Sequence, residues 1–128
     1  MILQRWWAAP NSIIGHALGA MHRCKPCEIE GGIVEYYGNS SLRSWGIAAI
    51  VFGNTINYGV GVNPNGIVPR YDQSGFVVLR DHEIAHVAQY RALGPFFLPA
   101  YLLCEGWARI FRRINAFENA ADNACDPQ

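Results

Sequence analysis

The sequence carries little charge and almost no lysine. Of 128 residues, 16% are charged and 51% are hydrophobic, and Lys25 is the only lysine. The formal net charge is zero, and the arginines are scattered. So apolar a composition excludes an intrinsically disordered chain. Because no basic stripe is present to neutralise phosphates, we expect no nucleic-acid partner.

A long uninterrupted apolar run is also absent. The longest one, GPFFLPAYLLC at residues 94–104, has about half the length that a membrane span needs. Residues 1–21 include Pro10 and His16, so they lack the continuous apolar core of a signal peptide. We therefore expect neither a transmembrane span nor a signal peptide, and a cytoplasmic location by default. Docking on a membrane surface remains open.

Cysteine is scarce, with Cys24, Cys27, Cys104 and Cys125 as the only examples. The first two form a CKPC pair, which is typical of a redox motif, of half a zinc site or of two free thiols. A second C-x-x-C, which would complete a zinc site, is missing. His22 stands next to the pair. Thiols, a disulfide and a metal site built from all four cysteines all remain open, and with them the compartment.

Turn-forming residues divide the first half of the chain. The length and the absence of repeats predict one domain over residues 1–128. For residues 1–22 we predict one or two short helices, interrupted at Pro10. Residues 28–58 are rich in Val, Ile, Tyr and Phe with Gly and Asn between them, which predicts a small antiparallel sheet. Residues 61–75, GVNPNGIVPRYDQSG, predict a loop.

The strongest helical pattern is FVVLRDHEIAHVAQYRAL at residues 76–93. Asp72 or Ser74 is the expected N-terminal cap, and Gly94 with Pro95 is the expected stop. Few positions in this segment are strictly polar. We therefore expect a central, largely buried helix.

Two further helices follow. One is expected over residues 98–114, with Pro99 tolerated in the first turn, and the last begins near Asn115. The elements together predict an α+β fold that is mostly helical, with a small antiparallel sheet over the helix of residues 76–93.

The string HEIAH places two histidines four residues apart with a glutamate beside the first. Residues at this spacing lie on one helix face, so His82 and His86 can bind one Zn²⁺. Glu83 then projects beside the metal, where it can take a proton from a bound water. The alternative is a buried, hydrogen-bonded histidine pair without metal, which would leave several polar groups to satisfy.

Two histidines leave the zinc tetrahedron incomplete, so a third ligand is needed. Ala92 stands where a metzincin has its third histidine. Later in the chain, Glu118 and Asp122 again lie four apart on one expected helix face. One carboxylate can bind the metal while the other accepts the free ring N–H of a ligand histidine.

Two of these assignments have alternatives. Glu118 stands three residues after Asn115, so the two could form a capping box at the start of the last helix. Gln89 stands one turn from His86 and could hold a water or a carboxylate near the metal, or lie on the surface.

The pair H-E-I-A-H and E-N-A-A-D resembles the gluzincin clan of zinc metallopeptidases, of which thermolysin is the familiar member. The resemblance implies His82, His86 and Glu118 as zinc ligands, Glu83 as general base, and Asp122 as the partner of a ligand histidine. It covers five residues in each of two places. It implies a minimal zincin-like core.

A looser resemblance extends over residues 82–121. HEIAHVAQY, LGPFFLPAY and NAFENAA are similar to segments of a set of short bacterial proteins of unassigned role. This resemblance supports the metal site but implies no substrate.

These residues favour a zinc-dependent hydrolase acting on peptides or proteins. Zn²⁺ would lower the pKa of its water, and Glu83 would pass the proton to the leaving amine. Tyr90, Tyr101 and Arg91 are each candidates for stabilising the oxyanion. By analogy with zincins, residues 45–59 are the expected substrate-binding strand.

The alternative is a zinc-bearing domain without turnover. Such a domain would dock on a membrane or a protein through its tryptophan-rich start and the FFLPAYLL segment at residues 96–103. The 128 residues leave little room for the second lobe of larger gluzincins. We therefore expect either a shallow site or one that a partner completes. The oligomeric state is not determined by the sequence.

Overall fold

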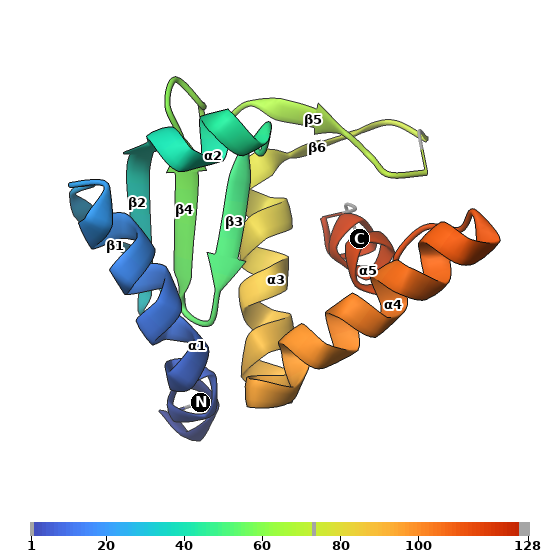
Figure 1. Cartoon of the computed structure of the whole chain (residues 1–128), viewed down its shortest axis with the longest axis horizontal. Coiled ribbons are helices and arrows are strands. Elements are labelled where there is room, and N and C mark those ends of the chain that lie inside the picture. The colour runs from blue at the N-terminus through green and yellow to red at the C-terminus, as the bar shows by residue number, and fades with distance from the viewer. Residues whose placement is uncertain (1, 73, 126–128) are drawn as a thin grey trace.

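The computed structural model describes residues 2–72 and 74–125, and Figure 1 shows their arrangement. Helices surround a small sheet, so the α+β class is confirmed. The elements in chain order are α1 (Ile2–Met21), β1 (Pro26–Ile29), β2 (Ile33–Asn39), α2 (Ser40–Trp45), β3 (Ala49–Phe52), β4 (Thr55–Gly59), β5 (Ile67–Pro69), β6 (Phe76–Val78), α3 (Leu79–Leu93), the short 3-10 helix η1 (Gly94–Phe96), α4 (Phe97–Phe111) and α5 (Ala116–Ala124).

The main sheet has the strand order β1-β2-β4-β3 and is mixed. The pairs β1–β2 and β3–β4 are antiparallel as expected, but β2 and β4 run parallel. The pair is parallel because β4 turns back from β3 into the place between β3 and β2. The helix α2, which the sequence analysis missed, carries the chain from β2 to β3. Asn39 caps α2 by accepting from the backbone N–H groups of Ser41 and Leu42, and Gly46 ends it in the left-handed conformation.

The main sheet lies between α1 and α3. Successive side chains of β4 point to opposite faces of the sheet, and every residue of this strand is buried. Thr55 and Asn57 face α1, where the side-chain amide of Asn57 donates to the carbonyl of Gly15 at 3.1 Å. Ile56 and Tyr58 belong to the apolar core that the sheet shares with α3. The strand thus keeps an alternation of polar and apolar residues although both of its faces are buried, because the polar face packs against α1 and not against solvent.

A buried carboxylate connects the sheet to the first turn of α3. Glu35 on β2 accepts from Arg80 Nε at 2.9 Å, from Arg80 Nη2 at 3.0 Å and from the Tyr58 hydroxyl at 2.7 Å. Burial favours the neutral acid, but the hydrogen bonds from Arg80, Tyr37 and Tyr58 prevail and lower the pKa of Glu35. This ion pair anchors the N-terminal end of α3.

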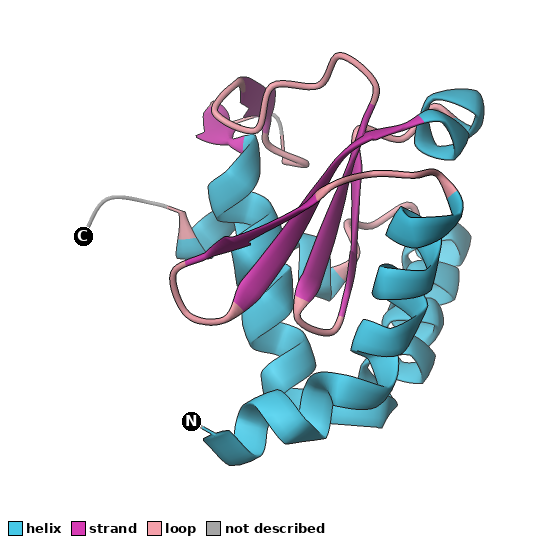
Figure 2. Cartoon of the chain, turned by 90° about the vertical axis from the view of Figure 1, so that its left-hand side faces the viewer, coloured by secondary structure: helices cyan, strands magenta, loops and turns pink. Residues whose placement is uncertain are grey.

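The expected break at Pro10 is wrong, because α1 continues through this residue. The helix axis changes direction instead, as Figure 2 shows near the N-terminus, which is the usual effect of proline inside a helix. Tertiary contacts hold the bent helix. Asn11 donates to the carbonyl of Gly94 at 3.0 Å, and the ring of Trp7 lies 6.0 Å from that of Phe96.

The start of α3 also differs from the prediction. Phe76–Val78, expected to open the helix, forms β6 instead. It pairs with β5, which lies inside the expected loop, and α3 begins at Leu79. Neither Asp72 nor Ser74 caps it. The loop supplies the acceptors, since the N–H groups of Leu79 and Arg80 donate to the carbonyls of Gly66 and Pro64.

The later helices start and stop close to the predicted positions, except that α4 ends at Phe111, three residues before the expected end at residue 114. The helix α3 ends at Leu93 before Gly94, and α4 carries Pro99 in its first turn. Asn115 caps α5, with its side chain accepting from the N–H of Phe117 at 2.9 Å. The cap therefore fixes the residue at which α5 begins.

Candidate metal centre

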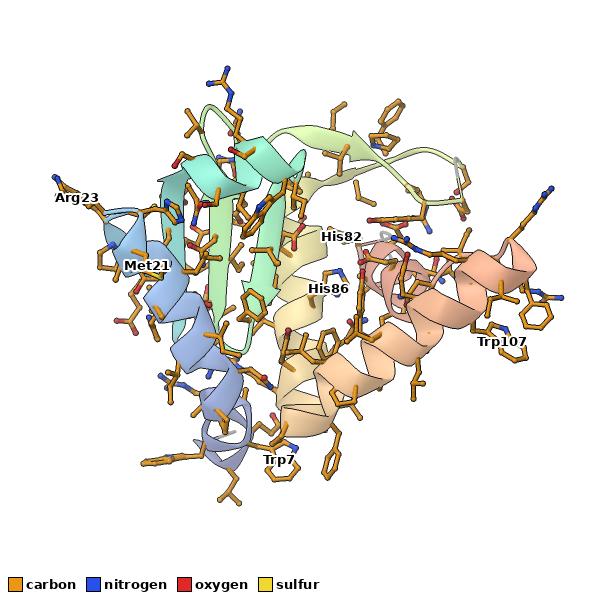
Figure 3. The ribbon with its side chains drawn as sticks, in the orientation of Figure 1. Trp7, Met21, Arg23, His82, His86 and Trp107 are labelled. Atoms are coloured by element: carbon orange, nitrogen blue, oxygen red, sulfur yellow. The ribbon has the colours of Figure 1, made fainter. Side chains whose placement is uncertain are left out.

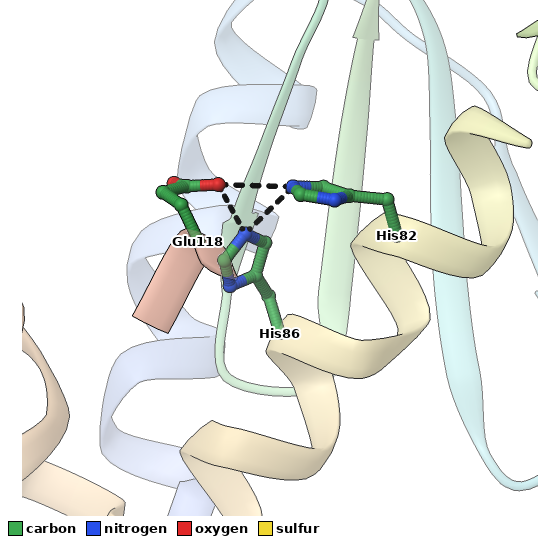
Figure 4. A group of neighbouring side chains, drawn as sticks. All are labelled: His82, His86 and Glu118. Carbon is green, nitrogen blue, oxygen red and sulfur yellow. Dashed lines mark hydrogen bonds and ion pairs between the residues drawn. The ribbon is translucent and has the colours of Figure 1, made fainter. Parts of the chain in front are cut away.

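Two histidines and a glutamate converge where α5 packs against α3. His82 and His86 lie on the side of α3 that faces α5 (Figure 3), and Glu118 extends from α5 towards them. Glu118 Oε2 lies 2.9 Å from His82 Nε2 and 3.1 Å from His86 Nε2, and the two Nε2 atoms are 3.1 Å apart (Figure 4). All three side chains are buried.

The outer nitrogens of both rings are held by acceptors. His82 Nδ1 lies 2.9 Å from Asp122 Oδ1, and a carboxylate oxygen can only accept, so Nδ1 carries the proton. His86 Nδ1 lies 2.8 Å from Gln89 Oε1. The amide of Gln89 is oriented by its donation to the carbonyl of Phe117 at 2.9 Å. In a neutral imidazole, each Nε2 is therefore left with a lone pair.

Three lone pairs consequently point at one small volume. Without a cation the two imidazole nitrogens and the carboxylate oxygen would repel one another. Ligands of a tetrahedral metal at about 2.0 to 2.1 Å lie roughly 3.3 Å apart, close to the observed separations of 2.9 to 3.1 Å. His82, His86 and Glu118 therefore fit a metal ion and could hold one.

The electrostatics of the cluster also favour positive charge. Burial alone would lower the pKa of both histidines, but Glu118 and Glu83 outweigh it and raise the pKa of His82 and of His86. Burial favours the neutral form of Glu118, yet its contacts with the two histidines hold its pKa well below the usual range. A cation at the cluster would be stabilised by these groups.

Tyr101 on α4 orients the Glu118 carboxylate. Its hydroxyl donates to Oε1 at 2.6 Å, which leaves Oε2 directed at the histidines. Asn115 caps α5 with its own side chain. The carboxylate of Glu118 thus contacts the histidine cluster and Tyr101, which favours the ligand role over the capping box.

Asp122 joins the cluster to the β5–β6 hairpin. Its Oδ2 atom accepts from the backbone N–H of Tyr71 at 2.8 Å. The guanidinium of Arg70 donates to the Asp122 carbonyl at 3.3 Å and to Asn123 Oδ1 at 2.6 Å. Sequence reasoning missed both hairpin residues, because they stand in the expected loop and belong to no motif.

Two adjoining hollows open beside the cluster, with volumes of about 340 and 440 Å³. Both are lined by His82, Glu83 and Tyr71. Ala49 of β3 also lines both, and the rest of β3 lines the larger one. The ring of Tyr71 stacks on that of His82, with centroids 6.0 Å apart and an interplanar angle of 19°. Burial raises the pKa of Glu83, although the histidines oppose the shift. Glu83 lines both hollows but is not among the three residues whose ligand atoms converge, so it lies beside the candidate ligands.

The larger hollow has an apolar wall from α4, formed by Phe97, Leu98, Tyr101 and Leu102. Of the three oxyanion candidates, Tyr101 and Tyr90 line this hollow. Tyr101 already donates to Glu118. Arg91 is directed elsewhere, since it donates to Asn54 Oδ1 at 2.8 Å and to the carbonyl of Gly31 at 2.7 Å.

The remaining histidines and cysteines lie apart from the candidate centre. His16 Nδ1 is 2.7 Å from the Tyr36 hydroxyl, and His22 Nε2 is 2.7 Å from Ser41 Oγ. Within residues 2–72 and 74–125, one group of histidine, cysteine or acidic side chains could hold a metal ion. It consists of His82, His86 and Glu118. Cys24, Cys27 and Cys104 have free thiols, and Cys125 Sγ donates to the Ala121 carbonyl.

No protein-family model, curated protein or solved structure matches this chain. The functional argument therefore depends on the geometry and chemistry of the candidate centre. Within the part of the chain that the structure describes, none of the helices has both the length and the apolar character needed to cross a membrane.

Proposed function

We propose that the protein is a zinc-dependent hydrolase, and more narrowly a small metallopeptidase. One observation carries the proposal: Glu83 lines the hollows beside His82, His86 and Glu118. Two imidazoles and one carboxylate at tetrahedral spacing are a ligand set that zinc hydrolases use, and they leave a coordination position open. The general base that such a hydrolase needs is the adjacent residue.

The proposed chemistry divides between the metal and the chain. Zinc at such a site supplies Lewis acidity, which polarises a carbonyl group and makes water easier to deprotonate. Glu83 removes the proton from the attacking water and delivers it to the leaving amine. Asp122 and Gln89 hold the two imidazoles in the tautomer that presents Nε2.

The proposed substrate is an extended peptide. β3 is an edge strand of the main sheet, and it contributes Ala49 to both hollows and its remaining residues to the larger one. An edge strand offers backbone N–H and C=O groups with which an extended chain can pair. The strand lies in the segment, residues 45–59, that the sequence analysis assigned to substrate binding. The apolar wall from α4 favours a substrate with an apolar side chain near the cleaved bond.

Digestion of a library of unstructured peptides, analysed by mass spectrometry, tests the proposal. The zinc-loaded wild type should cleave the library. Glu83→Gln should keep its zinc and lose activity by about a hundredfold or more. Glu30→Gln, which removes an exposed carboxylate away from the cluster, is the matched control and should cleave normally.

Two outcomes would overturn the proposal. Equal cleavage by wild type and Glu83→Gln would indicate another base or a contaminating protease. No cleavage by the zinc-loaded wild type, together with normal zinc binding, would favour the alternative of a zinc-bearing domain without turnover.

A further inference from the structure

Two helices expose apolar side chains on their outer faces. On α1 the inner face against the sheet has small or polar residues, such as Ser12 and Gly15, whereas Leu3, Ile13 and Met21 are largely exposed. On α4, Leu103, Trp107 and Ile110 recur at helical spacing and are between 61% and 76% exposed. Both helices therefore have an apolar face that no other part of the described chain covers.

The two apolar faces join at the start of α4. The ring of Trp7 lies 6.0 Å from that of Phe96. Figure 3 shows Trp7 and Trp107 projecting outward along the lower side of the molecule. We call this surface the docking face, and its residues are Trp6, Trp7, Phe96, Leu103, Trp107 and Ile110.

Charge is distributed unevenly between this part of the molecule and the rest. The segments that carry the docking face, residues 2–9 and 96–114, contain four of the ten basic residues, namely Arg5, Arg109, Arg112 and Arg113. The same two segments contain one of the ten acidic residues, Glu105, which pairs with Arg109 at 3.1 Å. The segments around the docking face are thus basic, although the whole chain has no net charge.

We propose that the docking face binds the surface of a bilayer that contains anionic lipids. Indole rings such as those of Trp6 and Trp107 are favoured at the boundary between headgroups and acyl chains. The arginines that follow α4 complement the negative headgroups. A second copy of the chain is a poorer occupant, because joining two basic faces would oppose arginines with too few acids to offset them.

Docking would also place the candidate centre near the lipid surface. Phe97, Leu98 and Tyr101 on one side of α4 line the larger hollow, and Leu103 and Ile110 face outward on the other. The bilayer and the hollow would thus lie on opposite sides of one helix. Lipid binding itself requires neither a metal nor catalysis.

Flotation of the full chain with lipid vesicles tests the proposal. Wild type should float with vesicles of phosphatidylcholine containing phosphatidylglycerol and bind pure phosphatidylcholine far less. Arg112→Asn combined with Arg113→Gln should weaken partitioning by about tenfold or more, because each basic residue near an anionic surface contributes about a fivefold effect. Trp107→Ala combined with Ile110→Ser should weaken partitioning to both kinds of vesicle.

Matched controls separate the docking face from general surface properties. Phe76→Ser removes an equally exposed apolar side chain on β6, and Arg43→Gln removes an exposed arginine on α2. Both controls should partition like wild type, and circular dichroism should show that every variant is folded.

Several results would overturn the proposal. These are no binding of the wild type to anionic vesicles, equal losses in the controls and the docking-face variants, or a dimer in lipid-free sedimentation that Trp107→Ala dissociates. The last result would assign the face to a second copy.

Discussion

The Oδ1 atom of Asp122 on α5 lies 2.9 Å from the Nδ1 atom of His82 on α3. The two residues are 40 positions apart in the sequence, and their contact sets the tautomer of the imidazole. The other Asp122 oxygen accepts from the backbone of Tyr71. One buried carboxylate therefore links the candidate ligand His82 to a second helix and to the β5–β6 hairpin.

Replacing Asp122 should weaken metal binding without removing a ligand. We expect the affinity for Zn²⁺ to fall by about tenfold in Asp122→Asn and about a hundredfold in Asp122→Ala, the range typical for partners of ligand histidines. Competition with a chromophoric chelator measures the affinity. Asp81→Asn, an exposed carboxylate beside His82, is the control. Unchanged affinity in folded Asp122→Ala would show that the contact does not orient the histidine.

The Glu35–Arg80 ion pair predicts a pH-dependent contribution to stability. The folded pKa of Glu35 is lowered, because hydrogen bonds from Arg80 and two tyrosines outweigh burial. The stabilisation is therefore complete above the unfolded pKa of about 4.3 and is lost as pH falls through the folded value. At neutral pH, Glu35→Gln should lower the free energy of unfolding by about 2 to 3 kcal/mol.

Urea unfolding of wild type and Glu35→Gln at several pH values measures this contribution. The difference between the two proteins should be constant from neutral pH to about pH 5 and should shrink in more acidic buffer. A difference that grows on acidification would contradict the assigned sign of the shift.

Substitutions at two helical glycines, Gly15 on α1 and Gly106 on α4, test how closely α1 packs on the sheet. A Cβ atom at Gly15 would lie 1.6 Å from Thr55 Oγ1, whereas a Cβ at Gly106 on α4 meets nothing within 4 Å. Gly15→Ala should destabilise the protein by about 3 kcal/mol because the helix must move off β4. Gly106→Ala should stabilise it by up to about 1 kcal/mol through helix propensity. Thermal unfolding of both variants checks the contrast, and equal effects would mean that α1 does not pack as described.

Local patterns were sufficient to predict much of the candidate centre. The spacing of His82 and His86 places both on one helix face, and that of Glu118 and Asp122 does the same on α5. The contact between the two pairs is a tertiary feature that periodicity could not predict. It was expected from the need for a third zinc ligand and from the resemblance to gluzincins. Tyr71 escaped prediction because its position depends on a hairpin contact with Asp122.

Tertiary packing explains the errors in the fold. The helix α1 continues past Pro10 because contacts with η1, such as Asn11 with Gly94, hold both of its halves. Residues 76–78 form β6 because β5 offers a pairing partner that a helical pattern does not reveal. The helix α2 has six residues, too few for a periodic signal, although its Asn39 cap and Gly46 stop are visible in the sequence.

Titration of the metal-free chain with Zn²⁺ in a calorimeter tests the central claim most directly. We predict one ion per chain for wild type and for the control His22→Ala, no measurable site in His82→Ala, and binding weakened by about a hundredfold or more in Glu118→Ala. Wild-type affinity and stoichiometry in a folded Glu118→Ala variant would contradict the account.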